Sequence, residues 1–164
     1  MEVKINSSEL LKALNHVHGI VEVRHTLPIL SNIILIAKDD ILSLSSTNLD
    51  IYCSDVISAE IQTAGEISVS AITFFEIVKR LPAGSDVIMS MESTDSELVI
   101  KCGRSKFNLS TLKIDDFPTI SDADLSTAFV MTSEELIRLV DKTKFAISNE
   151  ETRYYLNCLL YTSD

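Results

Sequence analysis

Glu9-Leu10-Leu11-Lys12-Ala13-Leu14, near the start of the chain, returns in degraded form as Glu135-Leu136-Ile137-Arg138-Leu139-Val140. The two copies lie 126 residues apart, and the flanking residues match at the same spacing. A repeat of this length indicates a domain-sized unit that is used twice. We therefore expect a complete first domain over residues 1–120, a polar linker over residues 121–127, and the start of a second, related domain over residues 128–164.

Bulk composition limits the class of protein. Hydrophobic residues make up 46% of the chain, which is enough for a core and excludes disorder. No apolar run approaches the roughly 18 residues of a membrane-spanning helix, and the first four residues lack signal-peptide character. The three cysteines form no Cys-x-x-Cys pair and the three histidines have no obvious further ligand, so we expect reduced thiols, no metal and no cofactor. These features predict a soluble, cytoplasmic protein without membrane contact.

The distribution of charge carries more information than its sum. The formal net charge is −10, which taken alone argues against a nucleic-acid partner. The three segments expected to be helical hold six basic and five acidic residues, whereas the rest holds eight basic and nineteen acidic residues. This segregation fits a protein that repels polyanions everywhere except on one helical face. Ordinary pairing of charges one helical turn apart explains it equally well.

The first domain is expected to contain two similar halves, each a strand, a helix and three further strands. In the first half, Asn6 caps the helix, and apolar alternation predicts strands at residues 3–5, 33–37, 41–46 and 51–57. The second half is predicted to have a helix at residues 71–81 and strands at residues 66–69, 87–91, 98–102 and 106–111. At an offset of 56 residues, Leu42, Leu44 and Ile51 match Leu98, Ile100 and Phe107. We therefore expect an α+β fold of two β-α-β-β-β halves, with two helices on one side of antiparallel sheets.

Each predicted helix turns an apolar stripe toward the sheet and basic residues outward. In the first helix, Leu10 and Leu14 belong to the stripe, and in the second helix Phe74 does. The third helix is predicted to follow a strand at residues 129–131 and to begin with a capping box of Thr132 and Glu135. The basic residues expected on the outer faces are Lys12, Lys79, Arg80, Arg138 and Lys142.

Two loops carry residues suited to nucleic-acid contacts. Arg24 lies in the middle of a long loop, where a solvated arginine and a phosphate-binding arginine both fit. In the equivalent loop of the second unit, Arg153 precedes Tyr154 and Tyr155. An arginine beside aromatic rings can grip a backbone or stack on a base, and tyrosines that anchor a strand edge explain the pattern as well.

No motif for catalysis stands out, since phosphate-binding loops, nucleophile elbows and zinc signatures are all missing from the sequence. Two alternatives to a nucleic-acid protein remain. A metal-dependent enzyme would need four carboxylates to converge, and a metal-dependent activity lost in Asp116→Ala would support it; the four are Asp39, Asp40, Asp115 and Asp116. A protein-interaction module would use the strand edge at Phe107, and Phe107→Asp would abolish its partner binding.

Several short blocks follow one another with characteristic spacing. They are Glu9-Leu10-Leu11-Lys12, Arg24-His25-Thr26-Leu27-Pro28-Ile29-Leu30-Ser31-Asn32, Phe74-Phe75, Leu81-Pro82-Ala83-Gly84, Gly103-Arg104-Ser105-Lys106-Phe107-Asn108-Leu109-Ser110-Thr111-Leu112, Asp116-Phe117-Pro118 and Arg153-Tyr154-Tyr155-Leu156-Asn157. Over residues 1–157 they resemble, in order, the bacterial DNA polymerase III β subunits, the family of replicative sliding clamps. Together the blocks are far more specific than any one of them.

The resemblance implies the DNA-clamp fold and a head-to-tail homodimeric ring with three similar domains per subunit. In such a ring, helices line the hole and strands form the outer wall. A faintly positive lining would hold double-stranded DNA through screened phosphate contacts, while topological linkage would provide retention. The implied function is processivity in DNA replication without catalysis, and this chain would be only the N-terminal part of the subunit.

The resemblance also assigns roles to residues. Arg24 and Tyr154 would contact DNA, with Arg153 beside Tyr154. The helix-face candidates for DNA contacts come from the predicted geometry and are Lys12, Lys79 and Lys142. The first domain's half of the subunit interface would contain Ile77, Phe107 and Leu109. The pocket that takes linear peptides from the DNA polymerase III catalytic subunit and the clamp loader would be bordered by Tyr155 and Leu156. The Asp116-Phe117-Pro118 block is expected to dock the chain as it leaves the first domain.

Some positions depart from the family's pattern. Ile72 and Thr73 stand where helices of relatives often carry basic residues, and Glu150 stands where a neutral DNA-contacting side chain is usual. These departures weaken the expected positive lining. Residues 158–164 do not resemble a clamp strand.

Overall fold

The computed structural model contains two compact units, Met1–Ser121 and Asp122–Asp164. It describes residues 1–21, 27–91, 96–112, 114, 117–118, 130–148, 155–156 and 158–160. The predicted linker, residues 121–127, lies outside these ranges.

The first half of unit Met1–Ser121 contains, in chain order, β1 (Glu2–Asn6), α1 (Ser7–Val17), the 3₁₀ turns η1 (His18–Ile20) and η2 (Pro28–Ser31), β2 (Asn32–Lys38), β3 (Ile41–Thr47) and β4 (Tyr52–Ser58). The remainder contains β5 (Glu60–Thr63), β6 (Gly65–Ser70), α2 (Ala71–Lys79), β7 (Asp86–Ser90), β8 (Glu97–Cys102) and β9 (Ser105–Leu112). Every strand predicted for this unit is confirmed, with ends that shift by at most one residue.

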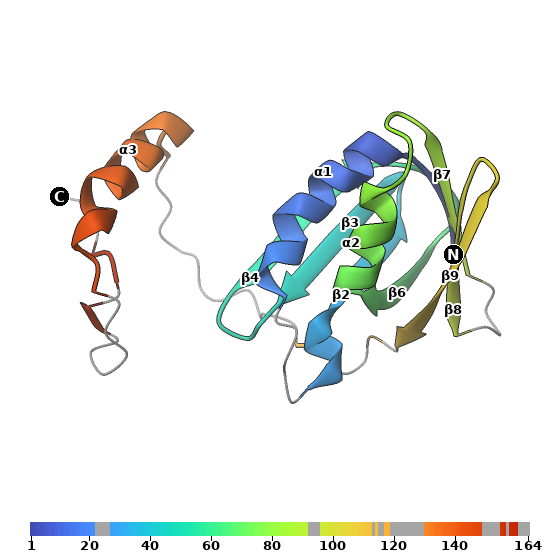
Figure 1. Ribbon diagram of the computed structural model, residues 1–164, viewed down its shortest axis with the longest axis horizontal. Helices are drawn as coiled ribbons and strands as arrows, with labels where there is room; N and C mark the ends of the chain where they lie inside the picture. Colours follow the sequence, from blue (N-terminus) through green and yellow to red (C-terminus); the bar gives the residue numbers. More distant parts are fainter. Residues whose placement is uncertain are drawn as a thin grey trace. The chain divides into compact units, whose positions relative to one another are not determined.

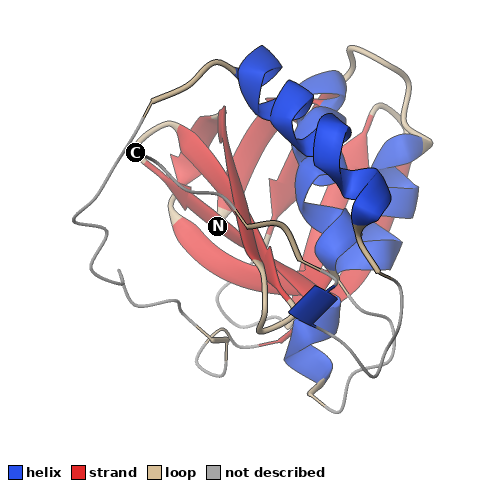
Figure 2. Ribbon diagram, turned by 90° about the vertical axis from the view of Figure 1, so that its left-hand side faces the viewer, coloured by secondary structure: helices blue, strands red, loops and turns tan. Residues whose placement is uncertain are grey.

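The two halves exchange their opening strands. All strands pair antiparallel, in the order β4-β3-β2-β6-β9-β8-β7-β1-β5. Figure 2 shows these strands as a curved set of red arrows. Strand β1 of the first half pairs with β7 of the second, while β6 of the second half pairs with β2 of the first. The helix that follows each opening strand carries the chain back to its own half. Each half therefore completes the sheet of the other.

Helices α1 and α2 lie side by side across one face of these strands (Figure 1). Leu10 and Leu14 of α1 and Phe74 of α2 are fully buried between helices and sheet, as their helical spacing predicts. Burial of each leucine contributes about 1.5–3 kcal/mol, so this face fixes the helices in place. The predicted α+β arrangement, with two helices on one side of antiparallel strands, is confirmed.

Strand β5 was not predicted. It follows β4 after the single residue Ala59 and pairs with β1. The segment is short and alternates only weakly, with Ile61 as its half-buried apolar residue. Its pairing with β1 is what makes it a strand, and sequence alternation carries little of that information.

Two predictions within this unit are corrected by the structure. Helix α2 ends at Lys79 and not at residue 81, because Leu81 precedes Pro82 and a residue before proline disfavours helical backbone. The match of Ile51 with Phe107 is also wrong. Ile51 precedes β4, and in the register of the two hairpins Asp55 is the counterpart of Phe107. The turn before β4 is longer than the one before β9, which shifts the offset.

A second apolar cluster covers the face of β2 that points away from the helices. Ile34 packs there with Ile29 and Leu30 of η2 and with Phe117, which is only 8% exposed. The prediction that the Asp116-Phe117-Pro118 block docks the chain leaving the first domain is confirmed for Phe117.

Unit Asp122–Asp164 repeats the opening helix of the chain. Helix α3 (Ser133–Thr143) and the 3₁₀ turn η3 (Lys144–Ala146) fall 126 residues after α1 and η1. The predicted capping box is present: the Thr132 hydroxyl accepts from the N–H of Glu135 at 3.2 Å, and the Glu135 carboxylate accepts from the N–H of Thr132 at 3.1 Å. The strand predicted at residues 129–131 is wrong for Val130 and Met131, since a strand needs a partner and none pairs with them among the described residues.

Candidate nucleic-acid interface

The outer faces of α1 and α2 each carry one of the predicted helix-face cations of the first unit. Lys12 on α1 and Lys79 on α2 are both exposed. Among the described residues, neither lysine lies within ion-pair distance of a carboxylate. Arg80 follows α2 and is held by Glu76 at 2.9 Å, so its charge is already matched. Lys12 and Lys79 are therefore the helix-face cations available to an anion.

The ammonium of Lys79 rests on an aromatic ring instead of a carboxylate. Its Nζ atom lies 5.5 Å from the centroid of the Phe75 ring, one helical turn earlier on α2. The imidazole of His18 stacks on the same ring, with centroids 3.9 Å apart and an interplanar angle of 9°. This arrangement joins the end of α1 to α2 at the level of Lys79.

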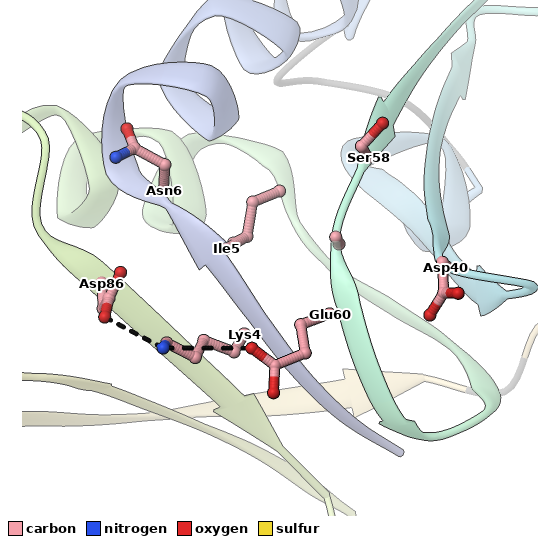
Figure 3. A pocket seen from close by; sticks show the side chains of 8 residues that line it. Lys4, Ile5, Asn6, Asp40, Ser58, Glu60 and Asp86 are labelled. Carbon is pink, nitrogen blue, oxygen red and sulfur yellow. Dashed lines mark ion pairs between the residues drawn. The ribbon is translucent and has the colours of Figure 1, made fainter.

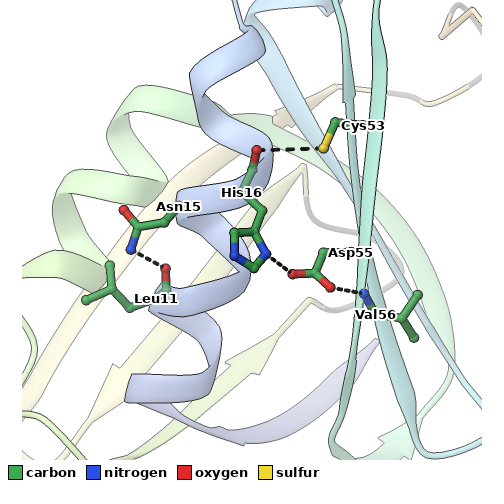
Figure 4. Close-up of polar contacts among 6 residues, drawn as sticks. All are labelled: Leu11, Asn15, His16, Cys53, Asp55 and Val56. Atoms are coloured by element: carbon green, nitrogen blue, oxygen red, sulfur yellow. Dashed lines mark hydrogen bonds and ion pairs between the residues drawn. The ribbon is translucent and has the colours of Figure 1, made fainter. Parts of the chain in front are cut away.

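The last turn of α1 carries a histidine that is hydrogen-bonded to a carboxylate (Figure 4). His16 Nδ1 lies 2.6 Å from Oδ2 of Asp55, whose side chain points from β4 toward the helix. The hydrogen bond from His16 holds the pKa of the Asp55 carboxyl below its usual value, and the N–H of Val56 adds to the effect. The thiol of Cys53 points to the backbone oxygen of His16 at 3.7 Å. The charge of Lys12 also lowers the pKa of Asp55, so this carboxylate lies within electrostatic reach of Lys12 although the two form no ion pair.

In the second unit, α3 presents Lys142 and Arg138 to solvent. Neither has a carboxylate partner among the described residues, whereas Lys144 is bound to Asp141 at 2.6 Å. The hydrogen bonds from Thr132 hold the pKa of Glu135 below its usual value. At the spacing of 126 residues, Arg138 is the counterpart of Lys12 and Lys142 is the counterpart of His16. Every residue of α3 is exposed, so the outer face predicted for Lys142 stays a prediction.

The loop residues assigned by resemblance are not all described. Arg24, Arg153 and Tyr154 lie outside the described residues, so their contact with DNA stays a prediction. Tyr155 and Leu156 are described and exposed, at 65% and 44%. Their role in a peptide pocket also stays a prediction.

Strand β9 offers an open edge to a partner. It pairs with β8 over residues 105–110, but with β6 only at Thr111 and Leu112. Within the described ranges, no strand pairs with the second edge of residues 105–110. Backbone donors and acceptors along such an edge can extend a sheet into another chain.

The side chains predicted for the subunit interface differ in exposure. Phe107 on β9 and Ile77 on α2 are half-buried at the margin of the core, so both can contribute to a surface. Leu109 is only 4% exposed and belongs to the core itself. Leu109 can therefore offer little side-chain area, and a partner would meet it mainly through the β9 backbone.

A shallow hollow of about 600 Å³ lies where β1, β5 and β7 meet the turn after β2 (Figure 3). Lys4 crosses it and pairs with Asp86 at 3.1 Å and Glu60 at 3.9 Å. The hydrogen bond to Asp86, followed by the charges of Asp86 and Glu60, raises the pKa of Lys4 above its usual value. Lys4 thus offsets part of the negative charge that Asp40, Glu60 and Asp86 give the hollow.

The described residues give no support to the metal-enzyme alternative. Asp39 and Asp40 occupy the turn between β2 and β3 and are exposed, whereas Asp115 and Asp116 are not described. In the described part of the chain, no three His, Cys, Asp or Glu side chains come together in a way that could hold a metal. None of the helices in these ranges has the length and apolar character required to cross a bilayer.

Comparison with solved structures defines the class of protein. The crystal structure of the C. crescentus beta sliding clamp matches with a TM-score of 0.92 at 51% identity, covering 96% of this chain and 42% of that one. A sliding clamp of Bartonella birtlesii bound to griselimycin matches with a TM-score of 0.91 at 38% identity, with the same coverage. The fold is that of the DNA clamps.

Sequence comparison places the chain within that class. The family described as "DNA polymerase III beta subunit, N-terminal domain" matches residues 1–121. The beta sliding clamp of Caulobacter vibrioides is 52% identical over 159 residues, and that of Pseudomonas aeruginosa is 40% identical over 161 residues. The chain belongs to the family of bacterial DNA polymerase III β subunits, as its motifs predict. It covers 43% of the length of either relative, while 97% and 98% of the chain itself are matched.

Sequence reasoning missed two features of the site. The His16–Asp55 pair joins residues 39 positions apart, and only the alternation of β4 hints that Asp55 faces a helix. The stack of His18 on Phe75 was also missed, although the Phe74-Phe75 block was noted. Phe75 follows the buried Phe74 and lies four residues before the outward Lys79. This spacing is the signal that could have indicated an aromatic ring at the helix surface.

Proposed function

We propose that this chain is the N-terminal part of a sliding-clamp subunit that encircles double-stranded DNA and tethers the replicative DNA polymerase for processive synthesis. The observation that carries the proposal is the face of α1 and α2, where Lys12 and Lys79 are exposed and lack carboxylate partners among the described residues. A duplex presents closely spaced phosphates. A few exposed lysines on the face of α1 and α2 therefore suffice for weak, sequence-independent contact.

The proposed role is that of a processivity factor and not of an enzyme. In the complete subunit, the open edge of β9 together with Phe107 and Ile77 would form one half of a head-to-tail interface in a homodimeric ring. Tyr155 and Leu156 would border the site for linear peptides of the DNA polymerase III catalytic subunit and the clamp loader. The complex would work in the cytoplasm, where the chromosome is copied.

The proposal is tested with two double variants of this chain and a short fluorescein-labelled DNA duplex. Lys12→Gln with Lys79→Gln removes the two helix-face charges. Lys101→Gln with Lys106→Gln is the matched control, since both residues are exposed on the sheet face opposite the helices and have no ion pair among the described residues. Fluorescence anisotropy over a range of salt concentrations gives the affinity and its salt slope.

The helix variant should bind more weakly, and its log–log salt slope should fall by up to about two, since each lost phosphate contact removes about 0.9. The control should keep the slope of the unmodified chain. Equal losses in both double variants would mean that the helical face is not the surface that meets DNA.

A further inference from the structure

The imidazole of His18 is held in an unusual way. Its Nδ1 atom is buried and has no hydrogen-bond partner in the described structure. Buried polar atoms are normally satisfied, so an unsatisfied one calls for a compensating interaction. The interaction present is the flat stack on Phe75, at 3.9 Å between centroids. His18 is therefore placed for its ring contact.

The backbone around His18 is fixed on several sides. Its N–H donates to the carbonyl oxygen of Leu14, and its own carbonyl accepts from the N–H of Val21 at 3.2 Å. One residue earlier, the carbonyl of Val17 accepts a buried hydrogen bond from the Ser46 hydroxyl of β3 at 2.6 Å. The imidazole therefore projects from an anchored helix end, and the Phe75 ring rests against a rigid support.

The supported ring in turn holds a cation. Lys79 Nζ lies over the Phe75 ring, and the nearby carboxylate of Glu76 is bound to Arg80. A lysine with a carboxylate partner must give up that partner to bind a phosphate, whereas a cation over a ring keeps its donors free for an anion. A flexible lysine stem also loses rotamer freedom on binding, and that loss is smaller when the ammonium is already localised.

We propose that His18 is a positioning residue for Lys79: stacked on Phe75, it holds the ring that localises the Lys79 ammonium on the helical face for contact with a DNA phosphate. The inference rests on the proposed function and deepens it. Lys79 makes the contact, Phe75 localises its charge, and His18 keeps Phe75 in place.

The experiment compares variants of this chain against the same labelled duplex. Lys79→Gln removes the contact, His18→Ala removes the support, and His18→Phe keeps a flat ring without the imidazole nitrogens. Phe75→Leu removes the ring but keeps an apolar side chain between α2 and the end of α1. It tests the same support by a second route if His18→Ala fails to fold. Each variant is measured for affinity, salt slope and the NMR shift of the Lys79 ε-methylene protons, which sense the ring current of Phe75.

Lys79→Gln should lower the salt slope by about one, because a phosphate contact is lost. His18→Ala and Phe75→Leu should weaken binding by about two- to fivefold at an unchanged slope, since the contact survives but its cation is no longer localised. Both should also move the Lys79 ε-methylene shift toward that of a solvated lysine. His18→Phe should restore affinity and shift.

Unaltered affinity in His18→Ala and Phe75→Leu, beside a lowered slope in Lys79→Gln, would overturn the positioning role and leave the proposed function standing. Failure of His18→Phe to restore affinity would also overturn it. If the unmodified chain shows no salt-dependent binding, the proposed function itself fails, and the inference fails with it.

Discussion

Asp55 is a carboxylate that faces a helix otherwise suited to bind anions, and its hydrogen bond with His16 governs how it titrates. The bond spans 2.6 Å, and it lowers the pKa of the Asp55 carboxyl. A depressed carboxyl pKa stabilises the fold at pH values above the unfolded value of about 3.9, and this contribution is lost as the pH falls through the folded value.

We therefore expect Asp55→Asn to reduce the free energy of unfolding at pH 6, and we expect this effect to shrink as the pH falls through the lowered pKa of the folded protein, where the carboxyl becomes protonated. Urea denaturation at pH 6 and at a pH below the folded pKa measures the difference. The control is Asp39→Asn, an exposed aspartate in the turn after β2. A loss that is the same at both pH values would show that the bond to His16 does not depend on the carboxylate charge.

Single residues also show where sequence reasoning is strong. Helical spacing alone placed Leu10, Leu14 and Phe74 in the core and Lys12 and Lys79 outside, because a helix presents the same face every three or four residues. It could not pair His16 with Asp55 or His18 with Phe75. Those contacts depend on how α1 sits against β4 and α2, which no local pattern encodes.

At the scale of the element, strand β9 joins two properties. Its residues 105–110 have a free edge within the described structure, and Phe107 lies half-buried beside that edge. Edge strands that face solvent are usually short or protected by charge, and β9 has eight residues. Both properties favour a strand that is covered in the assembled protein.

In the full-length clamp, Phe107→Asp should abolish subunit association while leaving the domain folded, because the charge would be buried at the interface. Size-exclusion chromatography with light scattering reports the association, and thermal melting reports the fold. Ser110→Asp is the control, since it adds the same charge to the exposed face of β9. Loss of cooperative melting in Phe107→Asp would instead assign Phe107 to the core.

Strands with regular alternation were predictable to within a residue, whereas α2 ended two residues early and β5 was not predicted. Its four residues become a strand by pairing with β1, and the sequence of either strand alone does not specify that pairing. The strand predicted at residues 129–131 shows the opposite case, in which a strand-like pattern lacks a pairing partner. There the alternation is present, but no described strand pairs with Val130 or Met131.

At the scale of the whole molecule, the uneven charge matters more than its sum of −10. A binding prediction from net charge would exclude DNA, while the outer faces of α1 and α2 expose lysines without carboxylate partners in the described structure. The family was predictable because its short blocks keep their order and spacing. The contacts of Arg24, Arg153 and Tyr154 remain predictions.

This chain alone should bind linear duplex DNA very weakly and with a steep salt dependence, since it spans about two fifths of a clamp and cannot rely on encirclement. Anisotropy titrations at low and physiological salt measure this. Sub-micromolar affinity that persists at physiological salt would contradict it, because a few screened lysine contacts cannot supply so much binding energy.

The reciprocal pairing of β1 with β7 and of β6 with β2 makes each half of the first unit depend on the other. A gene segment cut near Ala64 would encode a β1 that keeps β5 but lacks β7, and a remainder in which β6 keeps β9 but lacks β2. Each product would carry an open strand edge created by the cut. Tandem duplication of the interlocked pair keeps all of these strand pairs, which agrees with the repeat of 126 residues between α1 and α3.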